Sequence, residues 1–187
     1  PLFVDKVRDI VGLYLSPPNR ALVLSVDMIT FARNDLLFAA LDIASGFVIG
    51  KCYKRHRAKE FLSFLKEIDA RVPADLDIHI IMDNYATHKT KLVKAWLARR
   101  PHYHVHFTPT SASWINQVER WFAELTRKQL QRSAHTSVKD LEADIMKFID
   151  CHNENPKPFK WTKSADEILA SVKRFCHRVE QNLCGEL

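Results

Sequence analysis

The sequence predicts an α/β fold built on a five-stranded mixed sheet with helices on both faces. Two observations carry this prediction. Five short runs rich in β-branched and apolar residues recur along the chain, and only short turns separate the first three. The later runs alternate with longer segments whose apolar residues have helical spacing. A three-stranded meander followed by alternating helices and strands is the order that results.

The expected strands are residues 21–27, 36–44, 47–54, 76–83 and 102–110. The expected helices are residues 1–15, 57–72, 89–100, 113–131, 137–155 and 164–182. Each of the first three helices is followed closely by a proline, which cannot continue a helix. Ser137 is expected to cap the fifth helix, and Ser164 with Glu167 has the spacing of a capping box for the sixth. This order of strands and helices is ribonuclease-H-like.

The charge of the chain favours a polyanionic partner. The 187 residues carry a formal net charge of +6, and the pI is about 9.2. Basic residues gather at 51–59, 89–100 and 127–132, and such surfaces bind phosphates well. Only four glycines are present, and no Gly-rich phosphate-binding motif occurs, which argues against Rossmann and P-loop chemistry.

The cellular context is inferred from what the sequence lacks. The four cysteines form no Cys-x-x-Cys pair, so reduced thiols are expected. The first residues do not have the pattern of a signal peptide, and no apolar run has the length of a membrane span. We therefore expect a cytoplasmic protein with no membrane partner.

Three acidic residues carry the chemistry that the sequence predicts. Asp27 and Asp83 each end an expected strand, and Glu119 lies at the edge of the apolar face of an expected helix. Taken singly, the aspartates are ordinary turn or capping residues and the glutamate an ordinary surface residue. The two strands are the first and fourth of the order, which lie side by side in a ribonuclease-H-like sheet. Clustered carboxylates repel one another, and hard cations such as Mg²⁺ or Mn²⁺ relieve that repulsion.

The sequence also resembles a known family. The matching segments are VLSVD (23–27), LFAALDIASGFVIGKCYKRHRAKEFLSFL (37–65), IMDNYATHK (81–89), FTPTSASWINQVERWFAELTRK (107–128) and HNENPKPFKWT (152–162). They resemble bacterial insertion-sequence transposases of the mariner-like branch of the DDE transposase superfamily. The resemblance implies a ribonuclease-H-like catalytic domain in which Asp27, Asp83 and Glu119 bind two divalent ions. It also implies DNA strand cleavage and strand transfer, with transposon ends and target DNA as substrates.

The resemblance sets the expected domain organisation. Residues 1–18 are expected to form an N-terminal helix and linker, 19–135 the catalytic domain, and 136–187 C-terminal helices that complete it. Relatives carry a helix-turn-helix region ahead of this domain, so recognition of the transposon ends is expected to lie outside this sequence. Relatives also have a longer segment after the first aspartate, where this chain has only MITFARND (28–35). Such a shortening could displace Asp27 and abolish activity.

Several further residues are candidates for the site. Asn84, His88 and Asn116 lie near the acids in sequence and are candidates for hydrogen bonds to them. The candidate phosphate contacts are Lys89, Lys91, Arg99, Arg100, Arg127 and Lys128. Trp114, Trp121 and Phe122 could stack on unpaired bases, but their helical spacing favours core packing. His102, His104 and His106 alternate along one expected strand and would share a face, but no cysteine supplies the remaining ligands of a zinc site.

Two other functions compete with the transposase. The chain could be a catalytically decayed remnant that binds DNA or oligomerises, or a simple ribonuclease-H-like nuclease without joining activity. A homodimer is a candidate assembly, because transposases of this kind usually pair two DNA ends. The sequence predicts neither the DNA sequences of the ends nor those of the target.

Overall fold

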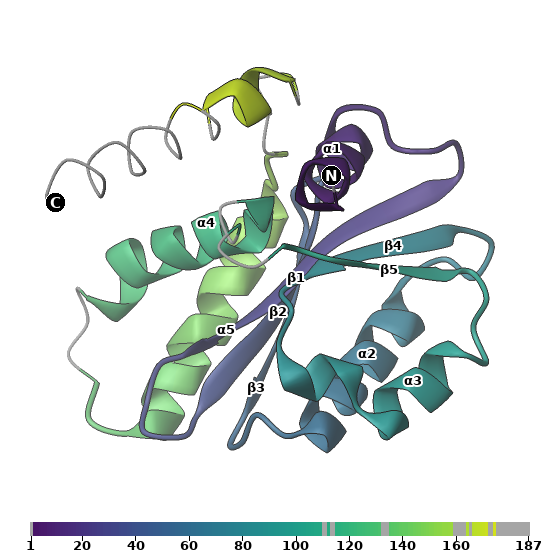
Figure 1. Ribbon diagram of the computed structural model, residues 1–187. Helices are drawn as coiled ribbons and strands as arrows, with labels where there is room; N and C mark the ends of the chain where they lie inside the picture. Colours follow the sequence, from purple (N-terminus) through teal and green to yellow (C-terminus); the bar gives the residue numbers. More distant parts are fainter. Residues whose placement is uncertain are drawn as a thin grey trace, which may run out of the picture.

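The computed structural model describes residues 2–109, 112, 115–131, 135–158, 164, 166–171 and 174. Five strands form one mixed sheet between two layers of helices (Figure 1). The strands are β1 (Ala21–Thr30), β2 (Leu36–Asp42), β3 (Val48–Tyr53), β4 (Asp77–Met82) and β5 (Tyr103–Phe107). Their order across the sheet is β3-β2-β1-β4-β5. The predicted fold class and the predicted meander are confirmed.

Strand β1 is central and joins the two halves of the sheet. It pairs antiparallel with β2, from Leu24 opposite Asp42 to Thr30 opposite Leu36. It pairs parallel with β4, but only as far as Val26 opposite Met82. The central strand is therefore longer than its parallel partner, and its last four residues pair on one side only.

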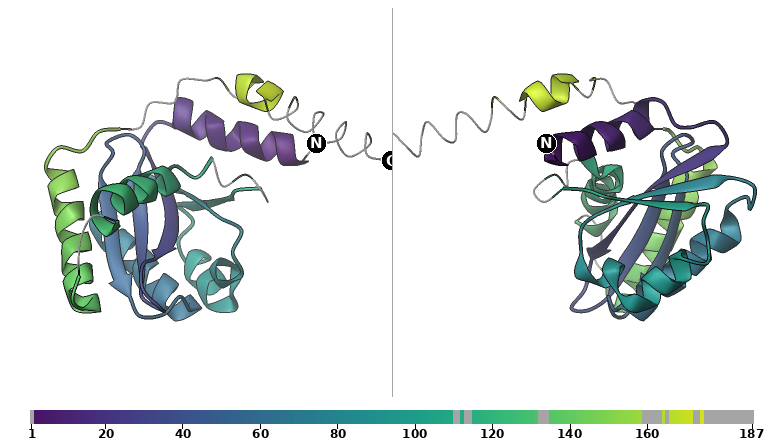
Figure 2. Two further views of the ribbon diagram at one scale, coloured as in Figure 1. Left: turned by 90° about the vertical axis from the view of Figure 1, so that its left-hand side faces the viewer. Right: turned by 45° about the vertical axis from the view of Figure 1, so that its right-hand side comes forward.

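The helices are α1 (Leu2–Leu15), α2 (Ala58–Arg71), α3 (Lys91–Leu97), α4 (Gln117–Leu125) and α5 (Val138–Glu154). Helices α2 and α3 cover one face of the sheet, and α1, α4 and α5 lie on the other (Figures 1 and 2). Under α2, the ring of Phe38 packs against Phe61 and Phe64, with ring centroids 5.6 Å apart in both pairs. Under α4 and α5, Trp121 and Phe122 are buried, as their helical spacing predicted.

Two predicted helices begin later than expected. The helix predicted from residue 89 is divided at Thr90, whose extended backbone separates a short 3-10 turn, η1 (Ala86–Lys89), from α3. The helix predicted from residue 113 begins at Gln117, because Asn116 is extended, and it ends in a π-helical turn, η3 (Thr126–Leu130). Trp114 lies outside the described residues.

The two predicted capping arrangements are present. The hydroxyl of Ser137 accepts a hydrogen bond from the Asp140 amide at 3.1 Å at the start of α5. Ser164 and Glu167 bond reciprocally through their side chains and amides, at 2.7 and 3.2 Å. Residues 166–171 are helical, and Ile168 is buried against the layer of α1, α4 and α5.

The turn between β2 and β3 is fixed by residues that follow in the chain. Gly46 has a positive φ of 78°, and its carbonyl oxygen lies 2.9 Å from His152 Nε2. A Cβ atom at Gly46 would overlap the backbone of Lys157. Next to the turn, the side-chain amide of Asn153 bonds both the amide and the carbonyl of Val48, at 2.9 and 2.8 Å. The C-terminal end of α5 is thereby attached to the sheet.

Replacing Gly46 by alanine should therefore destabilise the protein by about 1–3 kcal/mol, through backbone strain and the overlap with Lys157. Urea unfolding followed by circular dichroism measures this change. Gly12→Ala is the matched control, because Gly12 is exposed in α1 with open space around it. That control should stabilise by about 0.5–1 kcal/mol. Equal effects of the two substitutions would contradict the account of the turn.

Candidate active site

Asp27 and Asp83 are brought together by the register of β1 and β4. The parallel pairing ends at Val26 and Met82, so Asp27 and Asp83 are the next residues on two neighbouring strands. The prediction that Asp27 ends its strand is wrong, because β1 continues to Thr30 through its antiparallel pairing with β2. Asp27 thus lies within the central strand, whereas Asp83 directly follows β4.

The segment after Asp27 is a tight hairpin. Thr30 is paired with Leu36, and the intervening turn is held by the Phe31 amide, which donates to the Asp35 carbonyl at 3.1 Å. The register runs without interruption from the hairpin to Asp27, which lies opposite Ala39. The short connection therefore leaves Asp27 in its place on the sheet, beside Asp83.

The carboxylate of Asp27 is buried and held from two sides. Its exposed fraction is 8%. Oδ1 accepts a hydrogen bond from the Met28 amide, and Oδ2 accepts one from the side-chain amide of Asn116, both at 2.7 Å. Asn116 in turn accepts from the Ser25 hydroxyl, and that hydroxyl accepts from the Val118 amide at 2.9 Å. These bonds attach the beginning of α4 to the central strand.

Glu119 reaches the site because α4 begins where it does. It occupies the first turn of α4, three residues after Asn116, and is partly buried. It lines a groove with Met28 and Ile29, the two residues that follow Asp27 on β1. The negative charges of Glu119 and Asp83 both act on the carboxyl group of Asp27. Asp83 and Glu119 therefore both lie within electrostatic range of Asp27, although the three acids come from distant parts of the chain.

The ionisation of Asp27 reflects this environment. Burial raises its pKa to about 7, and the charges of Asp83 and Glu119 act in the same direction. The hydrogen bond from the Met28 amide and the nearby His88 oppose the shift. A buried carboxyl group near two other acids is stabilised in its charged form by a cation. The local electrostatics thus suit a positively charged ligand.

Asp83 has its own partner in His88. The Nδ1 atom of His88 lies 3.0 Å from Asp83 Oδ1, and the His88 side chain is only 1% exposed. The imidazole packs on the ring of Phe61, with centroids 4.1 Å apart. Its Nε2 atom is buried and has no hydrogen-bond partner. The packing of His88 fixes its ring, and the ring in turn restricts the orientation of Asp83.

The residues meet the donor requirements of a hard divalent cation. Carboxylate oxygens from Asp27, Asp83 and Glu119 are the ligands that Mg²⁺ and Mn²⁺ prefer. Among the described residues, no group of three His, Cys, Asp or Glu side chains is already close enough to hold a metal ion. Carboxylates that repel one another are expected to stay apart until a cation binds between them. The donor set therefore fits the metal. In the described residues, however, the three carboxylates are too far apart to share one ion.

The predicted basic contacts divide into two groups. Lys89 lies close to Asp83 in the chain, where its ammonium group donates to Asn84 Oδ1 and lies 4.7 Å from the centroid of the Phe107 ring. Lys91 is exposed at the start of α3. Arg127 lines the Glu119 groove, and Lys128 forms an ion pair with Glu124.

Arg99 and Arg100 are not brought to the acidic site. They precede β5, whose first residue pairs with the beginning of β4. Arg99 and Arg100 therefore lie at the amino ends of these strands, whereas Asp83 lies at the carboxyl end of β4. Arg100 is also engaged with Asp69 at 2.9 Å and stacks over Trp96 at 4.0 Å. These contacts give Arg100 a structural role at that end of the strands.

The prediction that three histidines share one face of a strand is wrong for His102. His104 and His106 lie in β5, but His102 precedes the strand and lines a depression with Asp69 and Arg100. The residue that joins the other two is His79 of β4, whose Nδ1 atom lies 2.9 Å from His106 Nε2. Burial lowers the pKa of His106 to about 4, which keeps this ring neutral at physiological pH.

Sequence reasoning missed two residues that support the site. Ser25 links Asn116 to the Val118 amide, and Tyr14 of α1 donates to the Ile115 carbonyl at 2.7 Å. Burial raises the pKa of Tyr14, so its hydroxyl remains a donor. The position of Ser25, two residues before Asp27 on a strand, was the available signal, because such residues share a face. Nothing local in the sequence marked Tyr14.

The raised pKa of Asp27 predicts how stability changes with pH in metal-free protein. The folded state holds the proton up to about pH 7, whereas the unfolded chain releases it near pH 3.8. The contribution of this group is therefore fully present below pH 3.8 and is lost as pH rises through about 7, by at most on the order of 4 kcal/mol. Urea unfolding in EDTA across this range should show the loss. Asp27→Asn should flatten the slope, and an unchanged slope would contradict the assignment.

Comparisons with known proteins identify the family to which the chain belongs. A family model described as DDE superfamily endonuclease matches residues 33–142, more than half of the chain, and includes Asp83 and Glu119. The insertion element IS630 uncharacterized 39 kDa protein of Shigella sonnei is 35% identical over 65 residues. That match covers 35% of this chain and 19% of the relative. None of the helices in the described part of the chain is long and apolar enough to span a membrane. Because the family model covers more than half of its residues, the chain belongs to the DDE superfamily of endonucleases.

Proposed function

We propose that the chain is the catalytic domain of a DDE transposase, which cleaves DNA strands and joins them with Mg²⁺ or Mn²⁺. The observation that carries the proposal is the meeting of Asp27 and Asp83 at the end of the β1–β4 pairing, with Glu119 on the adjoining helix. Membership of the DDE superfamily endonuclease family supports it independently.

Asp27, Asp83 and Glu119 would hold two divalent ions. When bound, such ions activate water or a 3′-hydroxyl group and stabilise the leaving oxygen at phosphorus. The protein fixes the ligands in advance: Asn116 and the Met28 amide orient Asp27, and His88 orients Asp83. Asn84 has a lesser part in this arrangement, because its side chain is exposed and bonds Lys89.

The substrate we propose is DNA, both as transposon ends and as target. Lys89 and Arg127 lie near the acids and are the favoured phosphate contacts, with Lys91 and Lys128 beside them in the chain. The net charge of +6 is consistent with a polyanionic substrate. Membership of the mariner-like branch, a homodimeric assembly and a cytoplasmic location complete the proposal.

The two competing functions have less support. A decayed remnant was suggested by the short connection after Asp27, but that connection forms a hairpin that keeps Asp27 in register. A buried carboxyl group with two neighbouring acids also destabilises the folded state, and a protein that binds no cation would gain nothing in return. A simple nuclease has the same acids, so only an assay for strand joining separates it from a transposase.

Asp83→Asn and Glu119→Gln should each abolish metal-dependent nicking of supercoiled DNA, by about 10³-fold or more, because each removes a charged ligand. Gel analysis of nicked plasmid in Mn²⁺ measures the effect, and circular dichroism should show an intact fold. Arg99→Gln is the matched control, because Arg99 lies at the opposite end of the strands from Asp83, and it should nick at close to the normal rate. Full activity of either acidic variant would overturn the assignment.

Two further measurements separate the competitors. Calorimetric titration with Mn²⁺ should show binding to the unmodified chain, and its absence in folded protein would favour the remnant. Incubation with a DNA duplex that has a pre-cut 3′ end should give joined products, whereas a simple nuclease would give hydrolysis alone.

Asn116→Ala should weaken Mn²⁺ binding by about 10–100-fold, because it removes a hydrogen bond that orients Asp27. Asn84→Ala is the comparison, since that side chain is exposed and does not bond an acid in the structure. Calorimetry should show a large effect of the first substitution and a small one of the second. Equal effects would contradict the positioning role of Asn116.

A further inference from the structure

The loop between β3 and α2, residues 54–57, lies at the same end of the sheet as Asp83. Tyr53, the last residue of β3, pairs with Leu36, and Leu36 pairs with Thr30 at the end of β1. Asp83 follows the end of β4, which runs parallel to β1. The loop after β3 and the segment after β4 therefore share one end of the strands.

Tyr85 joins this loop to Asp83. Its ring centroid lies 6.3 Å from that of His56 in the loop and 6.0 Å from that of His88, which it meets edge-on. Its backbone amide donates a hydrogen bond to Asp83 Oδ1 at 3.4 Å. Tyr85 is thus connected to the loop through its ring and to the acid through its backbone.

Lys54 and Arg55 give the loop positive charge that is available to a partner. Both residues are exposed, and neither forms an ion pair within the part of the chain that the structure describes. Arg57, two residues further on, is instead paired with Glu60. Exposed cations without an acidic partner can neutralise the phosphates of a polyanion.

Tyr85 also exposes an aromatic ring beside these cations. Its exposed fraction is 37%, although aromatic side chains are mostly buried in folded proteins. The neighbouring rings of His56 and His88 restrict its orientation, so less conformational entropy is lost when a ligand packs on it. Proteins that bind single strands combine such rings, on which unpaired bases stack, with a positively charged path for the backbone.

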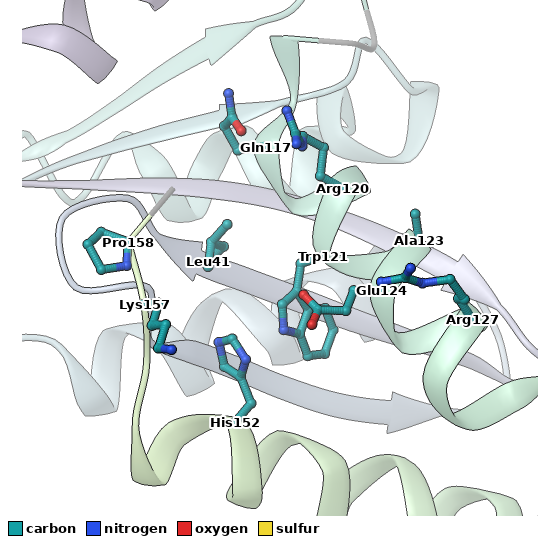
Figure 3. Close-up of a pocket in the computed structure, with 10 residues that line it drawn as sticks. All are labelled: Leu41, Gln117, Arg120, Trp121, Ala123, Glu124, Arg127, His152, Lys157 and Pro158. Carbon is teal, nitrogen blue, oxygen red and sulfur yellow. The ribbon is translucent and has the colours of Figure 1, made fainter. Parts of the chain in front are cut away.

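A groove on the other flank of α4 offers less to a base (Figure 3). Gln117 and Trp121 line it, but the amide atoms of Gln117 and the indole nitrogen of Trp121 are closed to solvent. These atoms cannot contact a ligand in the observed conformation, whereas the ring of Tyr85 is exposed without any rearrangement. The side of the acidic site next to β3 and α2 is therefore favoured for an unpaired base.

We propose that Lys54, Arg55, His56 and Tyr85 form a basic-aromatic surface, which binds one DNA strand next to the phosphate that is cut or joined. The proposal rests on the proposed function, because it takes DNA as the substrate. Lys54 and Arg55 contact the phosphates of this strand, and an unpaired base stacks on Tyr85. Because every base has a stacking face, the surface distinguishes unpaired from paired DNA and does not read the sequence.

The test uses two fluorescein-labelled DNA duplexes that differ only in a single-stranded 3′ overhang, made of thymidines in one and of abasic residues in the other. Both carry the same phosphates, so fluorescence anisotropy in EDTA isolates the contribution of the unpaired bases. The unmodified chain should bind the thymidine overhang about tenfold more tightly.

Tyr85→Ala should reduce this preference about fivefold or more, because it removes the stacking ring. Its melting temperature should stay close to that of the unmodified chain, because the side chain is exposed. Tyr85→Phe keeps the ring and should keep the preference. Phe47→Ala is the matched control, because Phe47 is similarly exposed, at 40%, but lies in the turn between β2 and β3 at the opposite end of the sheet.

Lys54→Gln and Arg55→Gln should each weaken binding of both duplexes to a similar extent, and each should reduce the salt dependence by about one phosphate contact. Lys66→Gln is the matched control, because Lys66 is also exposed but lies further along α2. It should leave both affinities unchanged.

Three results would overturn the proposal: equal binding of the two duplexes by the unmodified chain, a full preference in Tyr85→Ala, or an equal loss of preference in Tyr85→Ala and Phe47→Ala. Metal-dependent nicking by the unmodified chain is measured separately. Base-dependent binding that Tyr85→Ala removes, without any nicking, would support the basic-aromatic surface and reject the proposed function. Nicking together with equal binding of the two duplexes would support the proposed function and reject the surface.

Discussion

The hydrogen bond from Asn116 to Asp27 is the constraint on which the rest of the site depends. It connects the residue before α4 to the central strand, between two residues that are 89 positions apart in the chain. Ser25 closes the arrangement by bonding both Asn116 and the Val118 amide. Because Glu119 follows in the first turn of the same helix, the bond that orients the first acid also positions the third. A shift of α4 would therefore move two of the three acids relative to each other.

The electrostatics of Asp27 show how stability and function oppose each other here. A carboxyl group that is 8% exposed, beside two other acids, is costly to ionise, and its pKa rises to about 7. A surface position would have avoided this cost, but it would also have left the oxygens hydrated and free to rotate. Burial of Asp27 therefore lowers the stability of the folded state at neutral pH, but it fixes the carboxylate geometry and strengthens the attraction to cations. His88, buried behind Asp83, is a second case of a polar group held in the interior to orient an acid.

Helix α4 separates two grooves of different character. On one flank it presents Glu119 to the strand residues after Asp27. On the other it presents Gln117 and Trp121 to a groove closed by residues after α5. The turn at Gly46, against which Lys157 packs, holds that closing segment to the sheet. The two grooves are thus built on one helix, so their relative position is set by its packing on β1 and β2.

The sequence by itself determined the strands and most of the helices, because alternation, helical spacing and prolines act locally. It also indicated the three candidate acids, from their positions beside those elements. It also supplied the side-by-side placement of the first and fourth strands, through the order of elements. Only the tertiary structure decided that β1 runs on past Asp27, that α4 begins at Gln117, and that Arg100 turns to Asp69 instead of the site. It alone revealed Ser25, Tyr14 and the groove beside Gln117. These features depend on contacts between residues far apart in the chain, and such contacts leave no periodic mark on the sequence.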